Sequence, residues 1–273
     1  MKYMTFNRSC SYAGLANLLE EFEIHYEDHE IIKALNIPYL FIYNEQEDSY
    51  SAGAMIQSLP WFNYFLNTLG FNLIEEFFNP QQAINILNKS EKRYMVGILN
   101  DENSNLKHAV IFECKEGAKY RFLNLKHKDS IEPDYIFFSE EELNEKLPEK
   151  FPMGYLIKNN EIINFDATDQ IKYSLENIEK YKNRIIEFCS KKQEITEIVK
   201  VKDTLFAPLL LDILSMMELI GENTLANKIK YVQTSFLKAM NEKKTVLLTD
   251  YFSIEQIADI ISQYKLIIAD KLK

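Results

Sequence analysis

The sequence is poor in glycine, and this scarcity argues against the loops with which many enzymes hold nucleotides. Seven glycines occur in 273 residues, and none stands in a GxGxxG or GxxxxGK[ST] arrangement. In those arrangements the glycines let backbone N–H groups approach a phosphate chain closely. The sequence therefore gives no support to a nucleotide cofactor, and we expect no cofactor.

Cysteine is equally scarce. The chain has three cysteines, Cys10, Cys114 and Cys189, and no two of them have CxxC spacing. An odd number without this spacing argues against a disulfide framework and against a thiolate zinc site. His25 and His29 are four residues apart, a spacing that places two metal ligands on one helix face. However, the stretch HYEDH is not HExxH, so we expect no bound metal.

Neither excess basic charge nor a long apolar run is present. The formal net charge is −10 with a pI near 5.1, which disfavours a phosphate-neutralising surface and hence nucleic acid as a partner. No segment reaches 18 uncharged apolar residues, and the first ten residues contain no signal-peptide core. We expect a cytoplasmic protein that does not bind a membrane.

What the sequence does contain is an order of segments typical of an α+β fold. Apolar residues at helical spacing predict helices in the first ninety residues and again beyond residue 170. Strands are predicted at 71–78 and, after the first group of helices, at 93–99, 107–116, 119–126 and 154–165. The break KEGAK falls between the runs 107–116 and 119–126, so these two predict an antiparallel hairpin. We predict a domain over residues 1–168 and a helical C-terminal region over 169–273.

Two local features of the first part belong to this prediction. Asp28 stands before a run of isoleucines and is interpreted as the cap of a helix that ends before Pro38. The stretch NEQEDSYSAG (44–53) is acidic and rich in turn residues, and is interpreted as a surface loop.

Cys10 is the first candidate for chemistry. It lies at a predicted helix start, where unpaired N–H groups and the helix dipole favour a thiolate. On the helix it shares a face with Ala13, Gly14 and Asn17, and these small residues allow another element to approach closely. Taken alone, a free cysteine is more often a small buried residue, which is how we interpret Cys114 and Cys189.

A histidine and an asparagine supply possible partners. His108 begins a predicted strand after a polar loop, so it can lie at a sheet edge and act as the base for a thiol. Asn124 follows sixteen residues later, across the hairpin, where its amide oxygen can orient the imidazole. The pattern predicts a Cys-His-Asn site formed by Cys10, His108 and Asn124.

The stretches SCSYAGLANLL, LNTLGFNLIEE and HAVIFECKEGAKYRFLN together resemble a known family over roughly residues 1–130. They are similar to the papain-like cysteine peptidases of the C39 type, the leader-cleaving domains of bacteriocin exporters. They also resemble the related N-terminal domain of the butirosin-biosynthesis acyltransferases, enzymes that carry a helical C-terminal region after that domain. The sequence departs from the C39 pattern in having Ser11 after the cysteine and Asn124-Leu125 in place of Asp-Pro.

The resemblance also implies an oxyanion hole beside the nucleophile. The glutamine that usually supplies its amide is missing, and Met4 stands at about that place. The Cys10 backbone N–H is the expected first donor, and the Asn7 side chain is a candidate second donor. Asn7 can equally be a helix cap, a role also open to Ser9.

These observations lead to two functional hypotheses. The first is thiol-dependent acyl transfer or hydrolysis at an amide or thioester, with a peptide, a small molecule or a carrier-bound acyl group as substrate. The second is a catalytically silent papain-like fold that serves as a peptide-binding or interaction module.

The helical region 169–273 carries partner hypotheses of its own. It is a candidate for homodimer formation or for docking a carrier protein. Because the chain is acidic, docking an acidic carrier requires Lys228, Lys230 and Lys238 to form a local basic patch.

Overall fold

The computed structural model describes residues 8–99, 107–125, 132–159, 161–242 and 245–273. The chain forms two compact units, one made of Met1–Leu35 and Gln57–Phe165, the other of Asn36–Ile56 and Asp166–Lys273. The chain passes from the first unit to the second between Phe165 and Asp166. Residues 36–56, which the prediction placed in the first domain, belong to the second unit.

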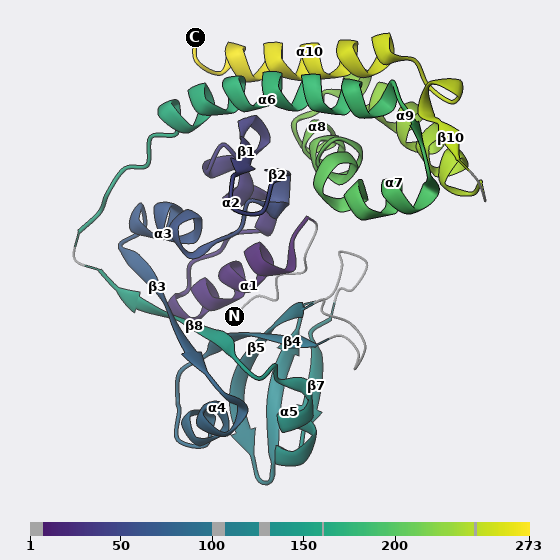
Figure 1. Ribbon diagram of the computed structural model, residues 1–273. Helices are drawn as coiled ribbons and strands as arrows, with labels where there is room; N and C mark the ends of the chain where they lie inside the picture. The colour runs from purple at the N-terminus through teal and green to yellow at the C-terminus, as the bar shows by residue number, and fades with distance from the viewer. Residues whose placement is uncertain (1–7, 100–106, 126–131, 160, 243–244) are drawn as a thin grey trace. The chain divides into compact units, whose positions relative to one another are not determined.

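The first unit has the predicted α+β fold (Figure 1). Its helices are α1 (Cys10–Leu19), α2 (Asp28–Ala34), α3 (Leu59–Asn67), α4 (Pro80–Leu87) and α5 (Glu140–Lys146), with a 3-10 turn η1 (Glu20–Phe22). Its strands are β3 (Phe71–Phe78), β4 (Tyr94–Leu99), β5 (Lys107–Glu116), β6 (Lys119–Asn124), β7 (Asp134–Phe138) and β8 (Phe151–Lys158). They form one antiparallel sheet in the order β3-β8-β4-β5-β6-β7.

The two faces of this sheet have different roles. One face carries a buried core in which aromatic and aliphatic side chains of the sheet, among them Phe112, Phe122 and Phe151, pack with α4 and α5. Helix α1 contacts β5, β4 and β8. Successive side chains of a strand point to opposite faces of the sheet, so the strand residues that face α1 alternate with those that point into this core. The residues that face α1 form the floor of the site described below.

The start of α1 follows from its sequence. Ser9 has extended backbone angles, and its Oγ accepts a hydrogen bond from the Tyr12 N–H, so Ser9 caps the helix as one of the two predicted candidates. Further along, a Cβ atom added to Gly14 would lie 2.6 Å from Met95 Sδ on β4. The small face beside Cys10 thus allows the close approach between helix and sheet that the sequence predicted.

The hairpin that carries the candidate histidine also forms as predicted. Strands β5 and β6 pair antiparallel, and Gly117 between them has a φ of 60°. A non-glycine residue adopts this left-handed conformation at a cost, so Gly117 stabilises the tight turn.

The second unit is mainly helical. Its longer helices are α6 (Thr168–Cys189), α7 (Ile195–Val201), α8 (Leu214–Ile220), α9 (Asn223–Met240) and α10 (Ile254–Asp270). Two π-helical segments, η4 (Lys202–Phe206) and η5 (Pro208–Ile213), join α7 to α8. Short elements complete it: η2 (Ile37–Tyr39), β1 (Phe41–Asn44), β2 (Ser49–Ala52), η3 (Gly53–Met55), β9 (Lys192–Gln193), β10 (Val246–Leu247) and η6 (Leu248–Asp250). Helices α6 and α10 lie side by side and antiparallel (Figure 1).

Hydrogen bonds between distant residues attach the segment 36–56 to these helices. The Phe41 N–H donates to Ser174 Oγ at 2.8 Å, and Asn177 Nδ2 donates to the Phe41 carbonyl at 3.1 Å. The Tyr264 hydroxyl donates to the carbonyls of Pro38 and Leu40.

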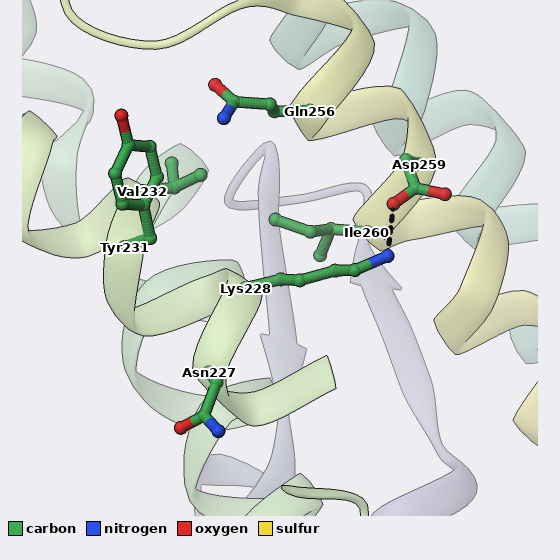
Figure 2. A pocket seen from close by; sticks show the side chains of 7 residues that line it. All are labelled: Asn227, Lys228, Tyr231, Val232, Gln256, Asp259 and Ile260. Atoms are coloured by element: carbon green, nitrogen blue, oxygen red, sulfur yellow. Dashed lines mark hydrogen bonds and ion pairs between the residues drawn. The ribbon is translucent and has the colours of Figure 1, made fainter. Parts of the chain in front are cut away.

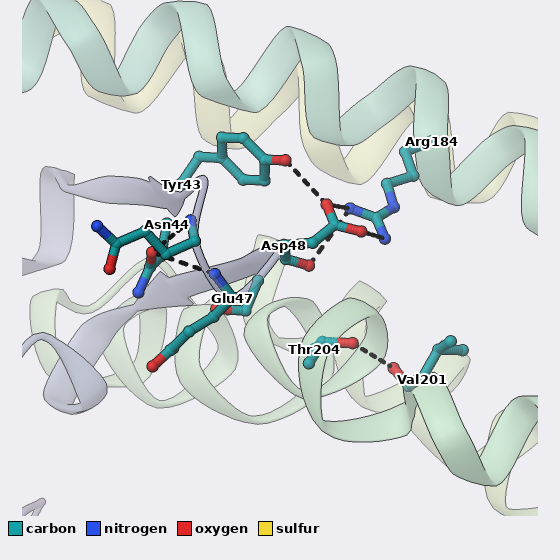
Figure 3. A network of polar contacts seen from close by, with 9 residues as sticks. Tyr43, Asn44, Glu47, Asp48, Arg184, Val201 and Thr204 are labelled. Atoms are coloured by element: carbon teal, nitrogen blue, oxygen red, sulfur yellow. Dashed lines mark hydrogen bonds and ion pairs between the residues drawn. The ribbon is translucent and has the colours of Figure 1, made fainter.

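The stretch 44–53 is therefore not a loop but largely the hairpin β1–β2 of the second unit. Asp48 lies at its turn, accepts a hydrogen bond from the Tyr43 hydroxyl at 2.8 Å and forms a bidentate ion pair with Arg184 of α6 (Figure 3). Asp48, an acidic turn residue that resembled part of a solvated loop, is thus bound to a helix residue more than 130 positions later.

None of the helices within the described ranges combines the length and the apolar character that crossing a bilayer requires.

Candidate active site

Three strand ends bring the candidate side chains together. His108 lies near the start of β5, Asn124 is the last residue of β6, and Asp134 is the first residue of β7. Asn124 pairs directly with Asp134 across the two strands and with Val110 on the other side, two residues beyond His108. The antiparallel register therefore collects three polar side chains at one end of the sheet.

The hydrogen bonds among these residues determine how each is oriented. Asn124 Nδ2 donates to Asp134 Oδ2 at 2.8 Å, and His108 Nε2 lies 2.8 Å from Asn124 Oδ1. A carboxylate only accepts, so the amide nitrogen must face Asp134 and the amide oxygen must face the imidazole. His108 Nε2 accordingly carries a proton and donates it, which leaves Nδ1 as the ring nitrogen available to a thiol.

The thiol of Cys10 is hydrogen-bonded to His108 from the first turn of α1. The thiol is partly buried, and this burial, which opposes ionisation, is the largest single influence on its pKa. Hydrogen bonds to the His108 side chain and to the Ala109 backbone act in the opposite direction and prevail. The pKa of Cys10 is therefore lowered, as a nucleophilic thiol requires.

The pKa of the His108 imidazole is shifted in the opposite direction to that of the thiol. The hydrogen bond with Cys10 raises the pKa of His108, partial burial lowers it, and the bond with Asn124 raises it again, with a net increase. A lowered thiol pKa and a raised imidazole pKa both shift the equilibrium from the neutral pair toward a thiolate-imidazolium pair.

The backbone before the thiol is held by a buried carboxylate that the sequence interpretation assigned differently. Asp28 does not cap α2, because the N-cap residue is Glu27. Instead Asp28 Oδ2 accepts hydrogen bonds from the N–H groups of Arg8 and Ser9 at 2.6 and 3.1 Å. Its side chain is fully buried, so these charge-assisted bonds fix the two residues that precede Cys10.

Beside the thiol lies a cavity of about 490 Å³. Its walls come from α1, from the start of α3 and the stretch before it, and from β3, β8, β4 and β5. Small residues line it near the thiol, namely Gly97 and Ala109, which face each other on β4 and β5. The candidate nucleophile therefore opens onto a space large enough for several atoms of a substrate.

Sequence reasoning missed three residues of this site. Asp134 lies behind Asn124, and Gln57 and Glu75 line the cavity with Cys10. Gln57 Oε1 lies 3.4 Å from Ser9 Oγ, and it is the one side-chain amide among the described residues that line the cavity. No local motif signals these residues, because a loop before α3, the middle of β3 and the start of β7 become neighbours only on folding.

The remaining candidates are divided between described and undescribed parts of the chain. Asn7, the tentative oxyanion donor, and Met4 lie outside the described residues. Cys114 is partly exposed on β5, and Cys189 is buried in α6, where burial raises its pKa to about 12. No histidine contributes to the pKa shift of either thiol.

The two histidines four residues apart are bound to different carboxylates. His25 Nδ1 lies 2.6 Å from Glu20, and His29 Nδ1 lies 3.1 Å from Glu27. Among the residues that the structure describes, no three His, Cys, Asp or Glu side chains are grouped so that they could hold a metal ion.

The helical unit contains a separate cavity of about 410 Å³ (Figure 2). It lies between α9 and α10 and is lined mainly by apolar atoms, with Lys228 paired to Asp259 at 2.7 Å. Lys230 is likewise paired, to Glu218 at 2.7 Å. Two of the three lysines considered for docking an acidic carrier are thus neutralised within the chain, which gives that partner no support.

Comparison with known proteins yields structural matches alone. No protein-family profile and no curated protein sequence matches the chain. It is similar to the crystal structure of the peptidase domain of Streptococcus ComA, a bi-functional ABC transporter involved in a quorum sensing pathway, with 13% identity and a TM-score of 0.39 over 57% of this chain and 99% of that one.

A second match is a double glycine motif protease from an AMS/PCAT transporter, solved in complex with its leader peptide. It shows 11% identity and a TM-score of 0.38 over 58% of this chain and 91% of that one. Both are C39-type peptidase domains, the first type that the sequence resembles, and neither is a butirosin-type acyltransferase. Similarity at this level does not identify an activity, so a function has to be inferred from the chemistry of the site.

Proposed function

We propose that the first unit is a thiol enzyme that transfers or hydrolyses acyl groups at an amide or thioester carbonyl. The observation that carries this proposal is the hydrogen-bonded series Cys10–His108–Asn124 beside a cavity. A thiol with a lowered pKa, a base in contact with it and an amide that orients the base are the three parts such a reaction needs.

In the first half of the reaction, the Cys10 thiolate forms a bond to the substrate carbonyl carbon, and the carbonyl π electrons move to oxygen. As the tetrahedral intermediate collapses, the bond to the leaving amine or thiol breaks and His108 Nδ1 gives that group a proton. The products are an acyl-enzyme, the protonated leaving group and a neutral His108.

In the second half, His108 removes a proton from water or from an acceptor amine, which then attacks the acyl carbon. The thioester bond breaks, the acyl product leaves, and the Cys10 thiolate and the His108 imidazolium are restored. Hydrolysis and transfer differ in the acceptor alone. The second step therefore uses the same residues in either case.

The oxyanion formed in both halves needs donors. The Cys10 N–H lies in the first turn of α1, where N–H groups have no acceptor within the helix, and it is the first donor we propose. Gln57 is a second donor that lines the cavity, and the Asn7 side chain stays a prediction from the sequence.

The decisive experiment is acyl trapping followed by intact-mass spectrometry. Incubation of the full chain with a panel of peptide and N-acetylcysteamine thioesters should add the mass of one acyl group, located by peptide mapping on Cys10. Cys10→Ser should abolish the adduct, His108→Ala should slow its formation by about a hundredfold or more, and the matched control Cys114→Ser should form it at the wild-type rate.

The outcome that contradicts the enzyme proposal is equally defined. If Cys10 forms no adduct with any thioester, and iodoacetamide alkylates it no faster at pH 6 than a free thiol, the site has no activated nucleophile. Peptide binding by a silent fold would then account better for the cavity.

A further inference from the structure

The cavity beside Cys10 contains one carboxylate whose environment differs from that of an ordinary surface glutamate. Glu75 lies in the middle of β3, opposite Gly154 on β8. A Cβ atom added to Gly154 would lie 3.8 Å from Glu75 Cγ, an ordinary van der Waals distance, so the glutamate side chain lies directly beside this glycine. Gly154 in turn faces Met95 on β4, which also lines the cavity. The carboxylate thus belongs to the same floor as the residues next to the thiol.

Glu75 has no counter-ion among the residues that the structure describes. Within the described ranges, no ion pair or hydrogen bond engages its carboxylate, although the chain has many exposed carboxylates paired with lysine or arginine. Burial raises its pKa, since partial removal from water destabilises the charged form. A half-buried carboxylate without a partner carries an energetic cost that a cation from outside would relieve.

The other described side chains that line the cavity, apart from the Cys10 thiol itself, are not ionisable. Glu75 therefore sets the sign of the charge that the cavity attracts. A lysine or arginine in the wall would have cancelled this effect, and a second carboxylate would have indicated a metal site. The cavity has neither among the described residues.

We propose that Glu75 forms a subsite for a positively charged group of the substrate, so that the preferred acyl compounds carry an ammonium or guanidinium group within the length of the cavity from the carbonyl that Cys10 attacks. This inference rests on the proposed function and adds the class of substrate to it. An amine, a lysine side chain or an arginine side chain supplies the required charge, and Glu75 binds it through charge-assisted hydrogen bonds.

Charged thiol reagents test this subsite without any knowledge of the substrate. Methanethiosulfonates transfer their R–S group to a thiolate: a new disulfide bond forms at Cys10, and the bond to the methanesulfinate leaving group breaks. The probes are the trimethylammonioethyl reagent, the anionic sulfonatoethyl reagent and the neutral methyl reagent. The second-order rate constant at Cys10 is measured with each of them by mass spectrometry, at an ionic strength of about 20 mM.

The measured quantity is the ratio of the rate constants for the cationic and anionic reagents. Glu75→Gln should lower this ratio by about threefold or more, because it removes the charge inside the cavity. The neutral reagent corrects for any change in the reactivity of the thiol itself.

Glu76→Gln is the matched control. Glu76 is the next residue on the same strand, its side chain is exposed, and it lines a different pocket with Tyr94 and Tyr155. The substitution changes the net charge by the same amount, so the ratio should stay within about 1.5-fold of the wild-type value if the effect is local.

Acyl donors extend the test to the substrate itself. The N-acetylcysteamine thioesters of 6-aminohexanoic acid and hexanoic acid differ mainly in one terminal ammonium group. Wild type should be acylated faster by the first, and Glu75→Gln should lose that preference while Glu76→Gln retains it.

The two proposals fail in different ways. If Cys10 reacts rapidly with the neutral reagent and depends on His108, but the charge ratio is the same in wild type and Glu75→Gln, the cationic subsite is wrong and the thiol enzyme stands. If the neutral reagent labels Cys10 no faster than it labels Cys114, the proposed nucleophile fails and the subsite fails with it.

Discussion

Asn124 and Asp134 face each other across strands β6 and β7, and the Asn124 amide donates to the Asp134 carboxylate at 2.8 Å. This bond leaves the amide oxygen for the imidazole of His108. In the proposed enzyme, Asp134 is therefore a positioning residue. It touches no reacting atom, but it determines which end of Asn124 the histidine meets.

Removal of Asp134 tests this role. Asp134→Ala should slow the acylation of Cys10 by about tenfold to a hundredfold, because the Asn124 amide is free to rotate and the imidazole loses its fixed orientation. Asp134→Asn, whose amide oxygen can still accept the bond, should recover much of the rate. Glu140→Gln, which alters a carboxylate bonded to Tyr120 on the same unit, is the control. Equal rates for Asp134→Ala and wild type would refute the positioning role.

The three cysteines should differ in the pH dependence of their alkylation. Hydrogen bonding to His108 and Ala109 lowers the pKa of Cys10 in spite of burial, whereas burial raises the pKa of Cys114 and raises that of Cys189 to about 12. As pH rises, Cys10 should therefore ionise first and react with iodoacetamide first, measured by mass mapping of each site.

In the variant His108→Ala, the pH at which Cys10 reaches half of its maximal alkylation rate should be higher than in the wild-type protein. The partner that favours the thiolate is then absent, while burial still opposes ionisation. A Cys10 midpoint equal to that of Cys114 in the wild-type protein would contradict the pKa shift on which the nucleophile depends.

Asp28 should be important for the stability of the protein. Asp28→Ala leaves the N–H groups of Arg8 and Ser9 without their buried acceptor, and we expect a loss of about 2 to 4 kcal/mol in the free energy of unfolding. Urea denaturation measures this loss. Glu30→Ala, which removes the exposed bond to the Glu27 N–H at the start of α2, should cost only about 1 kcal/mol. A similar small cost for Asp28→Ala would show that the carboxylate does not hold the loop before Cys10.

Gln57 separates oxyanion stabilisation from thiol activation. Gln57→Ala should lower the rate of acylation by thioesters by about tenfold to a hundredfold, because a donor to the developing oxyanion is lost. It should leave the alkylation of Cys10 by iodoacetamide unchanged, since that reaction forms no oxyanion. If both rates fall together, Gln57 acts on the structure of the site rather than on the transition state.

The stability of the helical unit should depend on pH through Asp212. Burial raises the pKa of Asp212 to about 7, above that of an unfolded aspartate. The folded state thus binds this proton more tightly. The resulting stability is fully present below the pKa of the unfolded carboxyl and is lost as pH rises through about 7, by roughly 4 kcal/mol in total.

Asp212→Asn removes this dependence and should make the unit more stable than wild type at pH 8, but not at pH 4. Urea unfolding followed by circular dichroism at the two pH values provides the measurement. A wild-type stability that is flat between pH 4 and pH 8 would contradict the raised pKa of Asp212.

The sequence by itself determined the elements that depend on neighbouring residues. The cap at Ser9, the small face around Gly14 and the turn at Gly117 follow from local backbone chemistry, and the α+β order of segments follows from apolar periodicity. The placement of His108 near Asn124 was predictable for the same reason, because a hairpin joins their strands. Their proposed roles stay predictions that the experiments above test.

Only the tertiary structure decided which distant residues share the site and which unit the segment 36–56 joins. Asp134 reaches Asn124 through the pairing of two strands, and Glu75 reaches the cavity of Cys10 through the order of the sheet. Asp28, which resembled a helix cap, is an acceptor for the backbone twenty residues before it. Such contacts depend on strand register and on hydrogen bonds between remote residues, and no periodicity or motif along the chain encodes either.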